Sequence, residues 1–101
     1  MKNFRKFITT IVVALIATLT ACNEPEPIKA LVISGQNNHN WRVSHLAIKQ
    51  ILDNSGLFTT DILLTPPTGG DMSTFNPKFS DYDVVVLDYN GDRWSEKSDS
   101  A

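Results

Sequence analysis

Four runs of hydrophobic residues mark the chain, and three of them predict strands. Residues 28–34 form a nearly continuous apolar run that ends at Gly35, which is typical of a strand covered on both faces. Residues 58–64 form a second candidate strand. Two prolines and two glycines follow within six residues, and they predict that the strand ends there because such residues cannot continue a hydrogen-bonded ladder. Residues 82–88 form the clearest strand, with four apolar residues between polar ends.

Residues 41–54 have the spacing of an amphipathic helix. Asn40 is placed to cap its first turn, and Ser55 and Gly56 are suited to end it. The apolar face, which we expect to lie against the core, carries Val43, Leu46, Ala47, Ile48, Ile51 and Leu52. The opposite, polar face carries Arg42, His45, Lys49 and Asp53. This pattern predicts that His45 is an exposed surface histidine rather than a ligand.

The order strand, helix, strand, strand predicts a parallel α/β sheet of the doubly wound kind. Residues 72–79 are expected to be irregular or briefly helical, and Ser95 can cap a new helix shortly before the last residue, Ala101. Three strands and one complete helix make a poor core, because a parallel sheet needs helices on both faces. We therefore expect residues 28–101 to be the incomplete N-terminal part of a larger domain.

The fourth hydrophobic run lies near the N-terminus and predicts export. Basic residues at positions 2, 5 and 6 precede the uncharged residues 7–19, which are too few to cross a bilayer core of roughly 30 Å as a helix. The sequence Leu-Thr-Ala-Cys that ends at Cys22 resembles a bacterial lipobox, in which the cysteine is lipidated. This predicts a signal peptide over residues 1–21, with an ordinary signal peptide and a chance cysteine as the alternative.

Processing at Cys22 would place the protein in the cell envelope, anchored by lipid to the outer membrane on its periplasmic or surface-exposed side. Residues 22–27 would then be the lipidated cysteine and a stiff, proline-containing tether. The 80 remaining residues carry 6 basic and 11 acidic side chains. An acidic exported part argues against a nucleic-acid partner, and a single cysteine excludes both an intrachain disulfide and an all-cysteine zinc site.

Candidate chemistry gathers in two loops, residues 35–41 and 88–94, which follow the first and third strands. Ligands of open α/β sheets bind beyond the carboxyl ends of the strands, so these loops form one cleft if the strand order is 2-1-3. Amides and carboxylates beside aromatic rings suit a polyhydroxylated ligand such as a small carbohydrate. The residues that we expect to bind it are Asn37, Asn40, Asp88, Asn90, Gly91 and Trp94.

His39 is the candidate catalytic residue, because histidine titrates near neutral pH and can act as a general base or as a metal ligand. That role requires Asp88 or Asp92 to approach it. The alternative is a loop histidine that caps the following helix or bonds to a carbonyl group. For Trp41 and Trp94, lining of the cleft and buried packing remain alternatives. The sequence identifies no nucleophile, metal site or cofactor.

Two segments resemble the opening of a ThuA-like domain, of the trehalose-utilisation family. Residues 31–41 read Leu-Val-Ile-Ser-Gly-Gln-Asn-Asn-His-Asn-Trp, and residues 82–91 read Tyr-Asp-Val-Val-Val-Leu-Asp-Tyr-Asn-Gly. The resemblance implies a flavodoxin-like fold, similar to that of class I glutamine amidotransferases, and a link to disaccharide or keto-sugar metabolism. The family positions matched by single residues are His39, Asn40, Asn90 and Gly91. The nucleophilic cysteine of amidotransferase relatives would lie beyond Ala101.

The favoured hypothesis is therefore a lipid-anchored ThuA-like protein in the utilisation of a trehalose-type or keto-disaccharide, enzymatic when full length. One alternative is a carbohydrate-binding lipoprotein without catalysis. Another is a truncated remnant with no independent function.

Overall fold

The computed structural model describes residues 24–99 of the 101-residue chain. The predicted signal peptide, residues 1–21, and the predicted lipidation site, Cys22, lie outside the described residues. Residues 24–27 are exposed and have no regular secondary structure, so the fold begins at Ile28. None of the helices among residues 24–99 is long and apolar enough to cross a membrane.

Helices and strands lie where the hydrophobic pattern predicts them, with one strand shorter than expected. The third strand covers only the four apolar residues of the predicted residues 82–88, and Tyr82 and Asp83 precede it in extended or irregular backbone. The elements are β1 (Ile28–Ser34), α2 (Trp41–Asn54), β2 (Phe58–Leu64), the 3-10 turns η1 (Met72–Thr74) and η2 (Phe79–Asp81), β3 (Val84–Leu87) and α3 (Glu96–Asp99).

The three strands form a parallel sheet in the order β2-β1-β3, which confirms the order on which the predicted cleft depends. Ala30 of β1 is level with Thr60 of β2 on one side and with Val84 of β3 on the other. As the central strand, β1 is buried from Ala30 to its end, which explains why its sequence is almost continuously apolar. The fold is thus α/β with a three-stranded parallel sheet, compatible with part of a flavodoxin-like fold.

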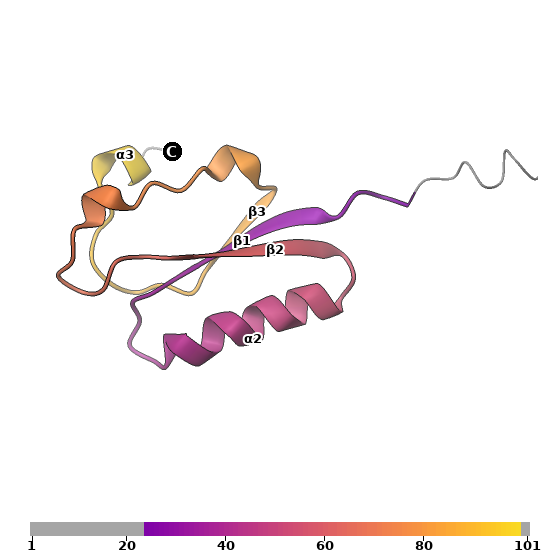
Figure 1. Ribbon diagram of the computed structural model, residues 1–101, viewed down its shortest axis with the longest axis horizontal. Helices are drawn as coiled ribbons and strands as arrows, with labels where there is room; N and C mark the ends of the chain where they lie inside the picture. The colour runs from indigo at the N-terminus through magenta and orange to yellow at the C-terminus, as the bar shows by residue number, and fades with distance from the viewer. Residues whose placement is uncertain (1–23, 100–101) are drawn as a thin grey trace, which may run out of the picture.

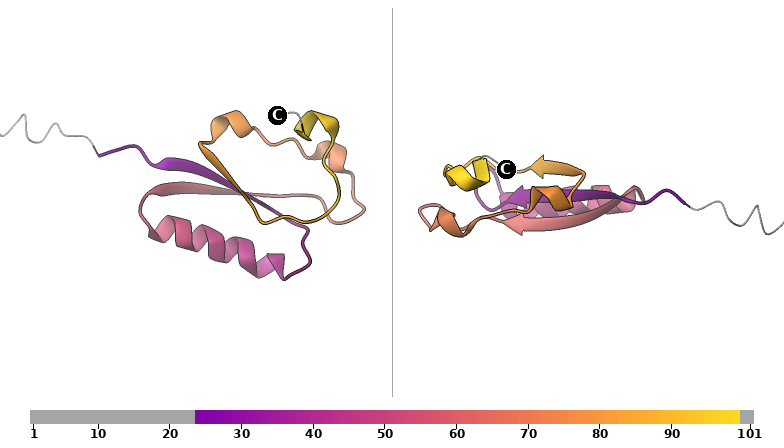
Figure 2. Two further views of the ribbon diagram at one scale, coloured as in Figure 1. Left: turned by 180° about the vertical axis from the view of Figure 1, so that it is seen from behind. Right: turned by 90° about the horizontal axis from the view of Figure 1, so that it is seen from above.

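Each face of the sheet has a different cover (Figures 1 and 2). Helix α2 lies along one face, whereas the connection from β2 to β3, with η1 and η2, crosses the other. On this second face Leu31 and Ile33 pack with Phe75, and the partly buried Trp94 closes the cluster. Because side chains alternate along a strand, Ser34 points to the other face, toward α2.

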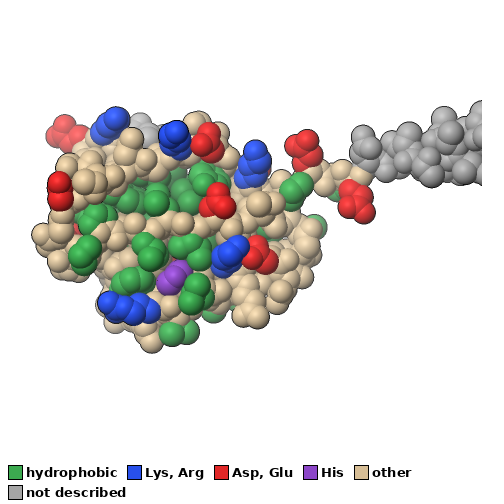
Figure 3. All heavy atoms as spheres, in the orientation of Figure 1, with side chains coloured by type: hydrophobic (Ala, Val, Ile, Leu, Met, Phe, Trp, Pro, Cys, Tyr) green, Lys and Arg blue, Asp and Glu red, His purple; other side chains and the backbone are tan. Residues whose placement is uncertain are grey.

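The orientation of α2 differs from the helical-wheel prediction. His45, expected on the exposed polar face, is 7% exposed, whereas Val43, Leu46 and Ile51 are more than half exposed. Hydrophobic side chains accordingly appear on the surface over this part of the molecule (Figure 3). Among the six residues of the predicted core-facing side, only Ile48 and Leu52 are partly buried.

A polar side chain explains this rotation of the helix. Ser44 turns inward to donate a hydrogen bond to Asp88 at the end of β3, and His45 and Lys49 lie beside it on the sheet-facing side. Lys49 remains satisfied there, because its ammonium group donates to Asp53 and to the carbonyl oxygen of Thr60. Polar contacts, rather than the widest apolar stripe, therefore set which side of α2 meets the sheet.

The first turn of α2 also lacks the predicted side-chain cap. Asn40 occupies the N-cap position, but its side chain makes no capping hydrogen bond. Its carbonyl oxygen instead accepts from the backbone N–H groups of Val43 and Ser44. The amide of Asn40 is therefore not committed to the helix.

Candidate functional site

The two predicted loops do meet at the carboxyl ends of β1 and β3. The backbone N–H of Asn90 donates to the carbonyl oxygen of Gln36 at 2.9 Å, and the backbone N–H of Asp88 donates to Ile33 at 2.9 Å. The loop after β1 can turn away sharply because Gly35 has a φ of +121°. These contacts place residues 35–41 beside residues 88–94, as the strand order requires.

A buried carboxylate forms the centre of this region. Asp88 is 6% exposed, and its Oδ2 atom accepts hydrogen bonds from the hydroxyl groups of Ser44 at 2.7 Å and Ser34 at 2.9 Å. Its Oδ1 atom lies 3.0 Å from Nε2 of His39. Burial raises the pKa of Asp88, but the hydrogen bonds from Ser44, Ser34 and His39 outweigh it, so the pKa of Asp88 is lowered. Asp88 is consequently ionised at neutral pH.

The ionised carboxylate determines the tautomer of His39. A carboxylate can only accept, so Nε2 of His39 carries the hydrogen, and in the neutral ring Nδ1 then carries the lone pair. The side chain of His39 is 51% exposed, against 5% for that of Asp88. Among residues 24–99, no hydrogen bond to Nδ1 of His39 is found. The ring therefore presents the lone pair of Nδ1 as an acceptor, with the buried Asp88 carboxylate bonded to its other nitrogen.

This cluster is not a Ser-His-Asp nucleophilic triad, although it contains all three residue types. The Oγ atom of Ser44 lies 3.2 Å from Nε2 of His39, which is the same nitrogen that meets Asp88. In a triad, serine and aspartate occupy opposite ring nitrogens. Since Ser44 donates its hydrogen directly to Asp88, its hydroxyl group supports the carboxylate and is not activated for attack.

The other predicted ligand-binding residues take different positions. Asn40 and Asn90 are exposed in the two loops. Asn37 is half-buried, and its Oδ1 atom accepts a hydrogen bond from the backbone N–H of Asn38. Gly91 lies against Gln36, where an added Cβ atom would be 2.3 Å from Oε1. Close packing, rather than a positive φ, therefore requires glycine at position 91.

The two tryptophans resolve differently. The ring of Trp94 packs against Phe75, with centroids 5.1 Å apart, and against Phe79 at 6.1 Å. Of the two alternatives left open by the sequence, the ring of Trp94 therefore takes buried packing. Trp41 remains half-buried at the start of α2, and the Arg42 guanidinium lies 4.6 Å from its ring centroid.

Sequence reasoning missed two supporting residues, Ser34 and Ser44, and the role of a third, Gln36. Ser34 and Ser44 hold Asp88, and Gln36 joins the loops, but a lone hydroxyl or amide in a sequence carries no signal of its partner. His45 was misassigned to the surface. Its Nδ1–H group donates to the carbonyl oxygen of Trp41 one turn earlier, which satisfies the buried ring without a ligand.

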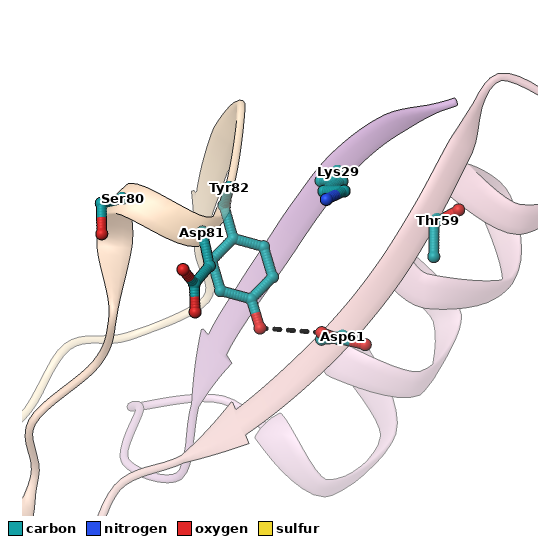
Figure 4. Close-up of a pocket in the computed structure, with 6 residues that line it drawn as sticks. All are labelled: Lys29, Thr59, Asp61, Ser80, Asp81 and Tyr82. Atoms are coloured by element: carbon teal, nitrogen blue, oxygen red, sulfur yellow. Dashed lines mark hydrogen bonds between the residues drawn. The ribbon is translucent and has the colours of Figure 1, made fainter. Parts of the chain in front are cut away.

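A separate polar hollow lies on the sheet face opposite α2, toward the amino ends of the strands (Figure 4). Its volume is about 540 Å³, and the Tyr82 hydroxyl group donates across it to Asp61 at 2.7 Å. This bond, with burial and nearby carboxylates, raises the pKa of Tyr82. The hollow lies at the other end of the sheet from His39, so we do not assign it to the candidate site. Within residues 24–99, no cluster of three or more side chains could hold a metal ion.

Comparison with known proteins relates the chain to one solved structure. No family model and no curated protein matches the sequence. A crystal structure described as that of a ThuA-like protein from Parabacteroides merdae ATCC 43184 matches with a TM-score of 0.73 and 57% sequence identity, over 74% of this chain. The match covers 27% of that protein, so this chain spans only about a quarter of its length.

Proposed function

The matched part of this chain belongs to the ThuA-like family, and on that premise we propose that its carboxyl-edge cleft binds a small carbohydrate of the trehalose or keto-disaccharide type. We propose further that His39 acts on the bound sugar as a general base. The single observation that supports this most strongly is the contact between His39 and the ionised Asp88.

The chemistry of the cleft fits a sugar hydroxyl group. The lone pair on Nδ1 of His39 accepts the hydrogen of a hydroxyl group, and the charge of Asp88 stabilises the imidazolium that forms when the proton is taken up. The amides of Asn37, Asn40 and Asn90 offer both donors and acceptors, which hydroxyl groups need.

Anchoring at Cys22 belongs to the same proposal. The exposed, extended residues 24–27 provide a tether between a lipidated cysteine and the first strand. A lipid on Cys22 would hold the cleft in the cell envelope. Labelling the full chain with a radioactive fatty acid in its host tests the anchor, with Cys22→Ser as the variant that must lose the label.

A second candidate function is binding without turnover. It is favoured by the geometry of Ser44, since His39 activates no hydroxyl nucleophile among the described residues. In this case Nδ1 of His39 accepts a hydrogen bond from the sugar and never takes its proton.

One experiment tests the proposal and separates the two candidates. Calorimetric titration of the full chain with trehalose and with 3-keto-trehalose should show saturable binding, followed by chromatography for products. His39→Gln should weaken binding at least about tenfold, the loss of one good hydrogen bond. Asn54→Gln, at the exposed end of α2, is the matched control and should bind normally. If neither sugar binds, the proposal is refuted. Binding without products would favour the second candidate.

A further inference from the structure

Gln36 is a buried amide that connects three loops. It is 2% exposed and directly follows the turn at Gly35 that ends β1. Its Nε2 group donates to the carbonyl oxygen of Pro66 at 2.8 Å, and its Oε1 atom accepts from the backbone N–H of Asp92 at 2.8 Å. Both ends of one side chain are therefore used, each by a different loop.

Two further contacts join the same loops. The backbone carbonyl oxygen of Gln36 accepts from Asn90, and the carboxylate of Asp92 accepts from the backbone N–H of Gly69 at 2.7 Å. Gly91 lies directly on the Gln36 side chain, with no room for a Cβ atom. The turn at residues 90–92 thus packs against the side chain of Gln36, and a hydrogen bond also joins it to the loop at residues 65–70.

From this arrangement we infer that Gln36 is a positioning residue for the sugar cleft. It touches no ligand itself, but it fixes the turn that carries Asn90 relative to His39, which lies three residues further along its own loop. The role needs an amide, because only a group with a donor and an acceptor can satisfy both Pro66 and Asp92. The part of this inference that concerns sugar affinity rests on the proposed function. The part that concerns the position of the turn, measured by hydrogen exchange, does not.

The test replaces Gln36 with methionine, which has similar length and no polar hydrogen bond. The control is Gln50→Met, an exposed glutamine on α2. Hydrogen exchange of backbone amides in the full chain is measured by NMR, and trehalose affinity is measured at a temperature at which all variants are fully folded. In Gln36→Met the Asp92 amide should exchange at least about tenfold faster, while the Asp88 amide, bonded within the sheet, keeps its protection.

The affinity for trehalose should fall about tenfold in Gln36→Met and stay unchanged in Gln50→Met. If Gln36→Met does not fold, Gly91→Ala serves instead, because it displaces the turn while leaving the Gln36 amide present. Unchanged Asp92 exchange would overturn the inference, as would faster exchange with unchanged affinity. If the natural sequence binds no trehalose, the proposed function fails, and the exchange of Asp92 alone decides whether Gln36 holds the turn.

Discussion

Nε2 of His39 lies 3.0 Å from Oδ1 of Asp88, although 49 residues separate the two in the sequence. The parallel sheet brings them together, because β1 and β3 are neighbours and the segments after their carboxyl ends share one edge. The pair joins an exposed imidazole to a buried carboxylate that two serine hydroxyl groups also hold. Its chemistry depends on the charge of Asp88.

Removing that charge should impair the cleft more than the fold. In Asp88→Asn, the amide can present either its oxygen or its nitrogen to His39, so the lone pair is no longer directed to Nδ1. If the protein turns over a sugar, we expect the rate to fall by about 100-fold or more, as when an orienting carboxylate is lost from a catalytic histidine. A steady-state assay measures this, and a rate within threefold of that of the natural sequence would contradict the role of Asp88.

Acid should remove a defined part of the stability. The pKa of Asp88 is lowered in the folded state, so its contribution to the free energy of unfolding is complete above its ordinary pKa of 3.8 and is lost as the pH falls through the lower folded value. Urea unfolding from pH 7 to pH 2 checks this. The stability difference between the natural sequence and Asp88→Asn should shrink below about pH 4; comparison with this variant cancels the similar shifts of Asp53 and Asp71.

Ser44 should prove to be a support for Asp88 and not a nucleophile. Ser44→Ala removes a hydrogen bond to a buried charge, which costs about 1.5–3 kcal/mol of stability. Turnover should change less than about tenfold once the variant is folded, whereas loss of a true nucleophile reduces it by about a millionfold. Thermal unfolding and a steady-state assay together separate the two roles, and complete loss of turnover in a folded variant would restore the triad.

The turn after β1 should be sensitive to one added methyl group. In Gly35→Ala, the new Cβ atom would lie 2.5–2.9 Å from three atoms of Thr65, two of them in the backbone, at a φ of +121°. We expect a loss of about 3 kcal/mol or more, because overpacking adds to the backbone cost. Gly56→Ala, also at positive φ but in open space, is the matched control and should lose only about 1 kcal/mol. Equal losses in urea unfolding would contradict the close contact with Thr65.

The hydrophobic pattern was sufficient to predict the strands, the helix and the edge at which the cleft forms. A run as apolar as residues 28–34 predicts a strand covered on both faces, and the observed order β2-β1-β3 then places the loop of His39 beside the loop of Asp88. The pattern could not predict the rotation of α2, because Ser44 turns inward for a partner on a distant strand. The role of Gln36 was hidden for the same reason, since its partners come from two other loops.

The tautomer of His39 is the most direct test of this account. Nitrogen-15 NMR of the imidazole groups in the full chain at neutral pH distinguishes a protonated from an unprotonated ring nitrogen. We predict that Nε2 of His39 carries the hydrogen and that the resonance of the unprotonated Nδ1 shifts when trehalose is added. A His39 ring that is protonated at Nδ1 and unprotonated at Nε2 would contradict the hydrogen bond to Asp88, and with it the proposed role of His39 as a general base.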